Sequence, residues 1–426
     1  MKKYTALALF FLVFGPSRLP ADDLQAGAAK VDITPPTGFP MWGYAARRAA
    51  GSKGVLDPLH ARAVVLAAGE QRIAIVSLDL GRAPTRKSTD AIRKRVKAAG
   101  VGHVFLVASH THHGPVLELE TWPKPEVPYV RELEDKLSGV ILNAAKEVRP
   151  ARLGVVGREV ALNRNRHSKR PDKPVDRELL VVRIEGIDGK VIAHLVNFAA
   201  HPTMQDAKVL SFSADYPGAM AALVEKETAA PCLFLQGAAG DLSTDAGNER
   251  GPEKFGQALG RQVLDLAKDI KCTIGKETKL EARAEEFKFG KRVDLGNPLI
   301  RAAYSAAFFP ALIDFYEREY REGVRPHLTT ALLDGRIGIV GVSGEFFCGH
   351  ALSLKKRARL EYVLFLGYCN DYHQYFPTIE AAAEGGYGAD PQVSPVEPGA
   401  GERIIDRALV HLYQMRGRLK NLELKK

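Results

Sequence analysis

The feature that most restricts the fold of this chain is a pattern of predicted elements that occurs three times. Each copy predicts two strands joined by a tight turn, then a loop, a helix, a third strand and a second loop. The copies cover residues 61–110, 178–241 and 328–377. Hairpins that alternate with helices and further strands are typical of α/β proteins with mixed sheets. We therefore predict an α/β fold in which mixed β-sheets, built from strand-strand-helix-strand units, are flanked by helices.

Side chains that can bind a metal ion or a proton follow the predicted strands in every copy. They are Asp79, His110, His201, Asp241, Glu345 and Tyr375. Open α/β sheets place their ligands in the crevice beyond the carboxyl ends of the strands. The pattern thus predicts that polar side chains from all three copies converge at these strand ends.

The stretch Val104–Pro115 carries the densest group of such side chains, because a short apolar run ends there in a cluster with three histidines. In an extended backbone alternate side chains share a face, so His110 and His112 should point one way and His113 the other. Two imidazoles on one face suit a metal site, or one metal ligand beside an acid or base. The alternative is a polar strand–loop junction with surface histidines.

Residues 1–21 have the pattern of an export signal. Lys2 and Lys3 precede the apolar run Leu7–Phe14, and Leu19–Ala21 forms an acceptable cleavage site. The apolar run is too short to span a bilayer, although a membrane anchor is an alternative. We expect an exported protein, periplasmic or secreted, whose mature part is residues 22–426.

Charge and cysteine content limit the classes of partner and of metal site. Removal of the signal would lower the formal net charge from +10 to +7. The chain has no dense Lys/Arg tract, so we do not expect a nucleic-acid partner. The moderate surplus of positive charge suits solubility or peripheral contact with an anionic membrane surface. The four cysteines form no C-x-x-C pair, so we do not expect a thiolate zinc site. We expect the cysteines to be free and buried.

The stretch Pro298–Tyr320 predicts an amphipathic helix that is interrupted near Pro310. Packing of this helix on the sheet is the favoured interpretation, and a lid that faces lipid is the alternative.

If the polar side chains at the strand ends meet, they can form a metal site that catalyses hydrolysis. Two imidazoles and a carboxylate, from His110, His201 and Glu345, make a typical hydrolytic zinc shell, which Tyr375 would complete. His112 could then transfer protons, and Arg164 could stabilise negative charge on a carbonyl oxygen. The residues alone do not select this set from the twelve histidines and many carboxylates of the chain.

Several motifs of the chain occur together, in the same order, in one known family. They are Ala29–Pro36 with Met41–Ala45, Val107–His112 with Gly114-Pro115, Asn163-Arg164, Asn197–His201, Gln236–Ser243, Gly344–Phe346 and Asn370–Thr378. The ordered set resembles the motifs of the neutral/alkaline non-lysosomal ceramidases and covers about residues 26–390. It is much more specific than any single motif.

The resemblance implies a site and a reaction. Carried over position by position, the zinc ligands of that family fall on His110, His201, Glu345 and Tyr375. Its catalytic histidine and arginine fall on His112 and Arg164, and its second tyrosine falls on Tyr387. The implied reaction is zinc-dependent hydrolysis of an N-acyl amide, in which ceramide gives a fatty acid and sphingosine. Arg164 and Tyr387 would steady the oxyanion, and His112 would protonate the leaving amine.

A substrate groove is a further expectation. The cluster Met41, Trp42 and Tyr44, together with Phe308-Phe309, could flank a groove for an acyl chain, because such pockets are mostly apolar. The competing interpretation assigns these residues to the core.

The chain also departs from the family pattern. His113 replaces the serine that follows the second histidine, and the stretch Ile379–Gly386 lacks most of the acidic and aromatic residues of the family. We expect a catalytic domain without the C-terminal immunoglobulin-like domain of the family. Two alternatives therefore stay open: an exported zinc hydrolase of another N-acyl amide or ester, and a non-catalytic binding protein on the same scaffold.

Overall fold

The computed structural model describes residues 23–119, 129–306 and 308–419 of the chain. The predicted export signal, residues 1–21, lies outside these described residues. No helix in the described ranges is both long enough and apolar enough to cross a membrane.

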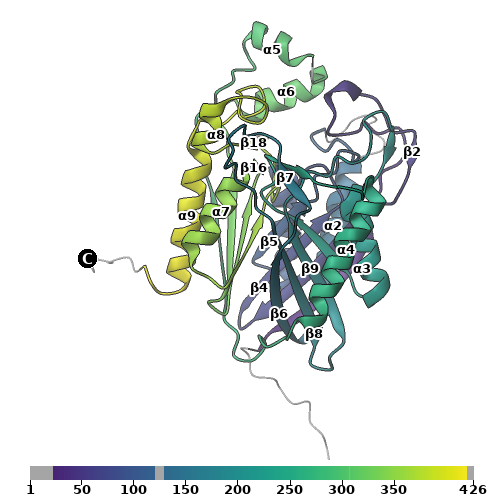
Figure 1. Cartoon of the computed structure of the whole chain (residues 1–426), viewed down its shortest axis with the longest axis vertical. Helices are drawn as coiled ribbons and strands as arrows, with labels where there is room; N and C mark the ends of the chain where they lie inside the picture. Colours follow the sequence, from purple (N-terminus) through teal and green to yellow (C-terminus); the bar gives the residue numbers. More distant parts are fainter. Residues whose placement is uncertain (1–22, 120–128, 307, 420–426) are drawn as a thin grey trace, which may run out of the picture.

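Two sheets form the centre of the molecule (Figure 1). The larger sheet has the strand order β11–β9–β8–β6–β1–β3–β4–β5, and the smaller has the order β13–β14–β15–β17. The strand bounds are β1 Gln25–Asp32, β3 His60–Ala68, β4 Gln71–Leu78, β5 His103–Ala108, β6 Arg149–Glu159, β8 Glu178–Gly186, β9 Val191–Phe198, β11 Cys232–Gln236, β13 Leu280–Glu286, β14 His327–Leu333, β15 Ile337–Val342 and β17 Tyr362–Leu366. Short two-stranded ladders are β2 Gly54–Val55 with β10 Ser211–Phe212, β7 Asn163–Asn165 with β12 Leu242–Thr244, and β16 Glu345–Phe346 with β18 Tyr375–Phe376.

The three predicted strand-strand-helix-strand units are confirmed. Each begins with an antiparallel hairpin, β3–β4, β8–β9 or β14–β15, and ends with a strand that pairs in parallel with the second hairpin strand. The connecting helices are α1 Arg86–Val96, α3 Asp215–Thr228 and α7 Cys348–Ala358. Each unit also has a preceding antiparallel strand that the sequence did not predict: β1, β6 or β13.

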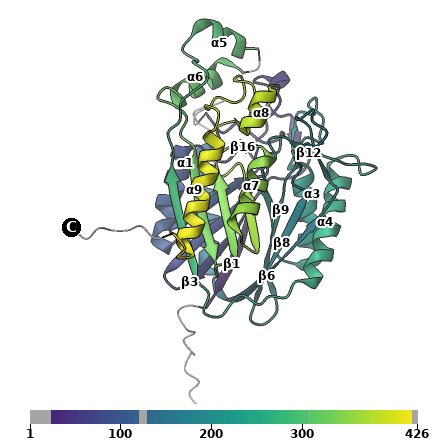
Figure 2. The same ribbon diagram turned by 60° about the vertical axis from the view of Figure 1, so that its left-hand side comes forward.

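Helices cover the outer faces of the two sheets, which pack against each other through their inner faces (Figures 1 and 2). One apolar cluster, with Val64, Ile75 and Leu180 from the larger sheet and Ile339 and Leu364 from the smaller, fills the space between them. The remaining helices are α2 Tyr129–Lys146, α4 Pro252–Asp269, α5 Pro298–Tyr304, α6 Pro310–Glu319, α8 Ile379–Glu384 and α9 Ala400–Met415, with two 3-10 turns at Ala45–Arg47 and Lys97–Ala99. Helices α1 and α2 cover one half of the larger sheet and α3 and α4 the other half. The predicted mixed α/β architecture is thus confirmed.

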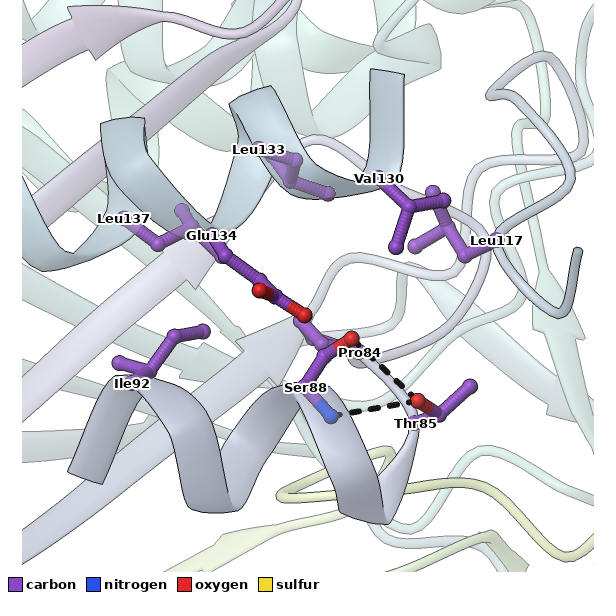
Figure 3. Close-up of a pocket in the computed structure, with 9 residues that line it drawn as sticks. All are labelled: Pro84, Thr85, Ser88, Ile92, Leu117, Val130, Leu133, Glu134 and Leu137. Carbon is purple, nitrogen blue, oxygen red and sulfur yellow. Dashed lines mark hydrogen bonds between the residues drawn. The ribbon is translucent and has the colours of Figure 1, made fainter. Parts of the chain in front are cut away.

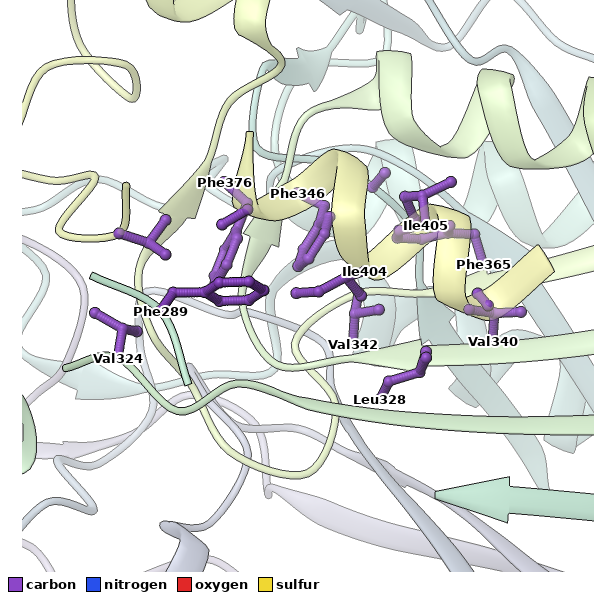
Figure 4. Close-up of a cluster of buried hydrophobic side chains, with 14 of the residues drawn as sticks. Phe289, Val324, Leu328, Val340, Val342, Phe346, Phe365, Phe376, Ile404 and Ile405 are labelled. Carbon is purple, nitrogen blue, oxygen red and sulfur yellow. The ribbon is translucent and has the colours of Figure 1, made fainter. Parts of the chain in front are cut away.

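The outer face of the smaller sheet packs on α7 and α9. Ile404 and Ile405 of α9 lie beside Leu328, Val340 and the other side chains of this face (Figure 4). The stacked rings of Phe346 and Phe376, 4.5 Å apart, extend the same cluster into the ladder formed by β16 and β18. Since burial of one large apolar side chain contributes about 1.5–3 kcal/mol, this packing holds the β16–β18 ladder firmly at the end of the sheet.

The predicted amphipathic helix is two helices, because Pro310 starts α6 after the break that follows α5. Both lie beyond the end of the sheets, above α8 and β18, rather than along a sheet face (Figures 1 and 2). Leu312, Ile313 and Tyr316 of α6 are nevertheless buried. The favoured expectation of packing on the sheet is therefore wrong in position, since α6 covers the end of the molecule that holds the polar strand ends.

Candidate metal centre and substrate cavity

Three units of the fold deliver the central residues of the site. His110 follows β5, and its backbone turns sharply there with a left-handed φ of 70°. His201 follows β9 and forms a bridge with Ser243. Glu345 of β16 pairs in register with Tyr375 of β18. All four residues are buried, so the strand ends predicted to meet do meet.

The ligand atoms of three of these residues converge on one point. Nε2 of His110 lies 3.1 Å from Nε2 of His201. The Glu345 carboxylate oxygen Oε2 lies 3.2 Å from the first nitrogen and 3.1 Å from the second. Two imidazole nitrogens and a carboxylate oxygen at such separations are a donor set that zinc prefers.

Backbone carbonyls fix the protonation of both imidazoles. Nδ1 of His110 donates to the carbonyl of Gly81 at 2.8 Å, and Nδ1 of His201 donates to that of Ala239 at 2.7 Å. With the proton on Nδ1, each Nε2 presents a lone pair toward the other and toward the Glu345 carboxylate. Converging lone pairs of this kind suit a metal ion, and the Nδ1 of each ring is held by a carbonyl, as in metal-ligating histidines. The residues therefore fit a metal ion.

Glu345 is held by two tyrosines that sequence reasoning missed as site residues. The hydroxyl of Tyr372 donates to Oε1 at 2.5 Å, and that of Tyr368 donates to Oε2 at 3.4 Å. Burial alone would raise the pKa of Glu345, but the adjacent His110 and His201 lower it well below its usual range. The carboxylate is thus ionised and ready to bind a cation.

His112 lies beside this group, whereas His113 does not. Nε2 of His112 is 3.4 Å from Nε2 of His110, and these two residues form with His201 a group of imidazoles able to hold a metal. His113 instead contacts the Arg47 guanidinium and the backbone carbonyl of Asp206. The predicted division of the three histidines is therefore observed, although the left-handed turn at His110, not an extended strand, produces it.

Burial and neighbouring groups keep His112 and His201 neutral. Burial, together with the adjacent His110 and His201, lowers the pKa of His112 well below its ordinary value. Burial and the Arg166 guanidinium lower the pKa of His201 to about 3. A neutral imidazole is the form that binds a metal or accepts a proton.

The structure corrects the position of the site arginine. Arg164 lies on β7 with its side chain exposed and no contact with the site in the described residues. Arg166, two residues on, donates to Nε2 of His201 at 2.9 Å and to the Tyr375 hydroxyl at 3.2 Å. The Asn-Arg pair occurs twice in succession, at 163–164 and 165–166. The second pair carries the inward arginine because the backbone of Arg166 is held by the Asp241 carbonyl.

Tyr375 and Tyr387 are neighbours at the edge of the site. Their ring centres are 5.6 Å apart, and Tyr387 is 69 % exposed while Tyr375 is buried. Burial of Tyr375 and its closeness to Glu345 raise its pKa well above the ordinary value. The predicted ligand Tyr375 therefore lies beside the histidine–carboxylate group, and the predicted Tyr387 lies at its entrance.

A cavity of about 190 Å³ opens next to these groups. It is lined by Met41, Trp42, Gly43, Tyr44, Ala45, Arg48, His112, Val116, Phe308, Phe309, Leu312, Tyr316, Glu345, Tyr372, Gln374, Tyr375, Tyr387 and Val393. All five residues of the predicted groove, Met41, Trp42, Tyr44, Phe308 and Phe309, are among them. The expected apolar groove is therefore present beside the candidate metal centre.

Another hollow lies between α1 and α2, away from this site (Figure 3). Apolar side chains such as Ile92, Leu133 and Leu137 line it together with Glu134, and it has no room for a water molecule. It is a packing gap rather than a binding site.

Comparison with known proteins agrees with this geometry. The family model described as neutral/alkaline non-lysosomal ceramidase, N-terminal, matches residues 24–248, which is more than half of the chain. The chain belongs to this ceramidase family.

Two solved ceramidase structures share the fold of this family member. The neutral ceramidase from Pseudomonas aeruginosa has a TM-score of 0.76 and 19% sequence identity, with 94% of this chain and 75% of that chain covered. A structure described as ceramidase complexed with C2 has a TM-score of 0.74 and 19% identity, with 93% of this chain and 76% of that chain covered. At these identities the match shows the shared fold.

Proposed function

We propose that this chain is a zinc-dependent amide hydrolase, which cleaves the N-acyl bond of ceramide or a ceramide-like lipid. The products would be a fatty acid and a sphingosine-type amine. The observation that carries the proposal is the convergence of His110, His201 and Glu345 beside an aromatic cavity. Family membership supports the ceramide class of substrate.

His110, His201, Glu345 and Tyr375 would hold the zinc ion. When bound, zinc lowers the pKa of a water molecule to about 7 and polarises an acyl oxygen. Glu345 is kept in place for this role by the hydroxyls of Tyr372 and Tyr368.

The other polar side chains would act on the substrate. Hydrolysis adds water across the amide: the acyl carbon gains the oxygen, the C–N bond breaks, and the nitrogen gains a proton. His112, neutral and next to His110, can accept a proton from water and pass it to the leaving nitrogen. Arg166 and Tyr387, which both contact Tyr375, can donate hydrogen bonds to the oxyanion.

The apolar end of the cavity would take the acyl chain, and its rim would meet a lipid surface. Leu299 of α5 is 82% exposed, and Ile379 of α8 and Tyr387 are exposed as well. Helices α5 and α8 lie at the same end of the molecule (Figures 1 and 2). Arg48 lines the entrance and would suit an anionic surface. Export by residues 1–21 would place the protein where such surfaces occur.

One observation favours a second candidate. Pockets that enclose a drug-sized ligand usually measure about 300–1,000 Å³, whereas this cavity measures about 190 Å³. A smaller N-acyl amide or ester would fit entirely within this cavity, whereas a ceramide would fit only in part. A non-catalytic binding protein is the remaining alternative, and the intact set of donors opposes it.

Hydrolysis of a panel of N-acyl amides separates these candidates. We expect the zinc-loaded protein to release fatty acid from ceramides, presented in micelles and in vesicles, faster than from acylated amino acids. The reverse order would favour the second candidate. Bound zinc without release from any member would favour the binding protein.

Substitution of the two neighbouring arginines tests the corrected assignment. Removal of one oxyanion donor typically lowers kcat about 10²–10³-fold. We therefore expect that loss for Arg166→Ala and less than a twofold change for Arg164→Ala, whose side chain is exposed. Steady-state kinetics on a short-chain ceramide, with zinc content measured in both variants, checks this. Equal losses in the two variants would contradict the assignment.

A further inference from the structure

Glu118 is a buried carboxylate that the proposed reaction does not use. Its Oε1 accepts hydrogen bonds from three side chains: Nε1 of Trp42 at 3.3 Å, Nη1 of Arg82 at 3.2 Å and the hydroxyl of Tyr316 at 3.0 Å. Its Oε2 accepts from the backbone N–H of Leu117 at 3.0 Å. The side chain therefore has four donors and almost no contact with solvent.

Two of the three side-chain donors belong to different walls of the cavity. Trp42 comes from the segment after β1 and Tyr316 from α6, and both line the cavity. Glu118 thus joins two walls that are more than two hundred residues apart in the sequence.

Arg82 extends the connection toward the metal centre. This fully buried guanidinium also donates to Asp371 at 2.8 Å, and Asp371 accepts from the backbone N–H of Tyr372 at 2.8 Å. The hydroxyl of Tyr372 donates to Glu345. A continuous series of hydrogen bonds therefore connects Tyr316, in the cavity wall, with Glu345, the carboxylate that would bind zinc.

The cost of burying these charges argues for a positioning role. A buried ion pair commonly stabilises a fold no more than well-packed apolar residues of the same volume. The pair instead fixes the orientation of the side chains that donate to it, because each donor must point at a fixed oxygen. Helix α6 is short and lies beyond the sheets (Figure 1), so a directed hydrogen bond from Tyr316 has a defined task in holding it.

We propose that Glu118 is a positioning residue that sets the width of the apolar cavity, and thereby the acyl chains it accepts, by holding Tyr316 and Trp42. The proposal rests on the proposed function in one respect: it takes a long acyl chain as the group that enters the cavity. Glu118 touches neither the candidate ligands nor the reacting atoms, and acts through the side chains that it orients.

Tyr316→Phe tests this with little disturbance of the core, and Tyr320→Phe is its matched control. Tyr320 is buried one helical turn further on, and its hydroxyl has no hydrogen-bond partner in the described residues. Loss of a hydrogen bond to a charged group corresponds to about a tenfold weaker interaction. We therefore expect Tyr316→Phe to weaken binding of a fluorescent C16 fatty acyl probe about tenfold, and Tyr320→Phe to leave it unchanged.

Two further readouts separate positioning from general destabilisation. The loss for Tyr316→Phe should shrink as the probe is shortened from C16 to C6, and zinc content should stay at the wild-type level. Glu118→Gln should show the same dependence on chain length. Trp42 and Trp122 are the two tryptophans of the chain, so Trp122→Phe leaves the fluorescence of Trp42 alone. In that background, acrylamide should quench this fluorescence more strongly in either variant.

The outcomes are decisive because probe binding does not require hydrolysis. Equal affinities for Tyr316→Phe and Tyr320→Phe, or equal losses at every chain length, would overturn the role of Glu118. Failure of the wild type to bind any acyl probe would also overturn it. Probe binding with the expected chain-length dependence, but without hydrolysis of any amide, would support the inference and reject the proposed function.

Discussion

His201→Ala should lose its zinc and all measurable hydrolysis. The Nε2 atom of His201 lies 3.1 Å from both Nε2 of His110 and the Glu345 carboxylate, so its removal takes away one of the converging donors. Among the described residues, a single group of such side chains is placed to hold a metal ion, and it contains His201 together with His110 and His112. Zinc per chain, measured after dialysis against a mild chelator, should fall from one to near zero.

His194→Ala is the matched control for this experiment. His194 is a buried histidine of β9, the strand that His201 follows, and it makes no contact with the candidate metal centre in the part of the chain that the structure describes. This variant should keep its zinc even if its melting temperature falls. Full zinc retention by His201→Ala under the same dialysis would show that the ion is held elsewhere.

His112→Ala should keep its zinc but lose kcat by about 10²–10⁴-fold, the usual contribution of a positioned acid or base. This equals about 3–5 kcal/mol of barrier. The reason is that His112 lies next to His110 and lines the cavity, where a leaving nitrogen would sit. Kinetics on a short-chain ceramide and metal analysis of the same sample measure both quantities.

His113→Ala is the comparison variant, because its imidazole faces Arg47 rather than the cavity. Its effect on kcat should be much smaller. The imidazole of His112 is close enough to His110 and His201 to serve as a third nitrogen ligand. Loss of zinc from His112→Ala would therefore assign it to metal binding, and equal losses of kcat in the two variants would contradict its role in proton transfer.

Much of the fold follows from local sequence, and the rest depends on tertiary pairing. The three hairpin–helix–strand units were predictable because apolar runs alternate with turn residues such as Asp334-Gly335. Strand β13, Leu280–Glu286, was missed because its alanines and glutamates favour a helix in isolation. Its pairing along the whole of β14 decides its conformation, as strand preference depends strongly on neighbouring strands.

The site was predictable where the family motifs are unambiguous. His110, His201, Glu345 and Tyr375 are brought together as expected, whereas the repeated Asn-Arg pair left two arginines to choose from. Only the three-dimensional path of the loop after β7 places Arg166 inward.

The contacts of Glu118 could not be predicted from the sequence. They join the segment after β1 with α6 and depend on where α6 comes to lie beyond the sheets. No local pattern marks such a residue.

The most direct test of the central claim is a zinc titration of metal-free protein with a long-chain ceramide as substrate. Mass spectrometry would measure the fatty acid and the sphingoid base that are released. We expect equal amounts of the two products, and a rate that rises in proportion to bound zinc up to one ion per chain. Hydrolysis by the metal-free protein at the same rate, or one bound zinc with neither product formed, would contradict the account.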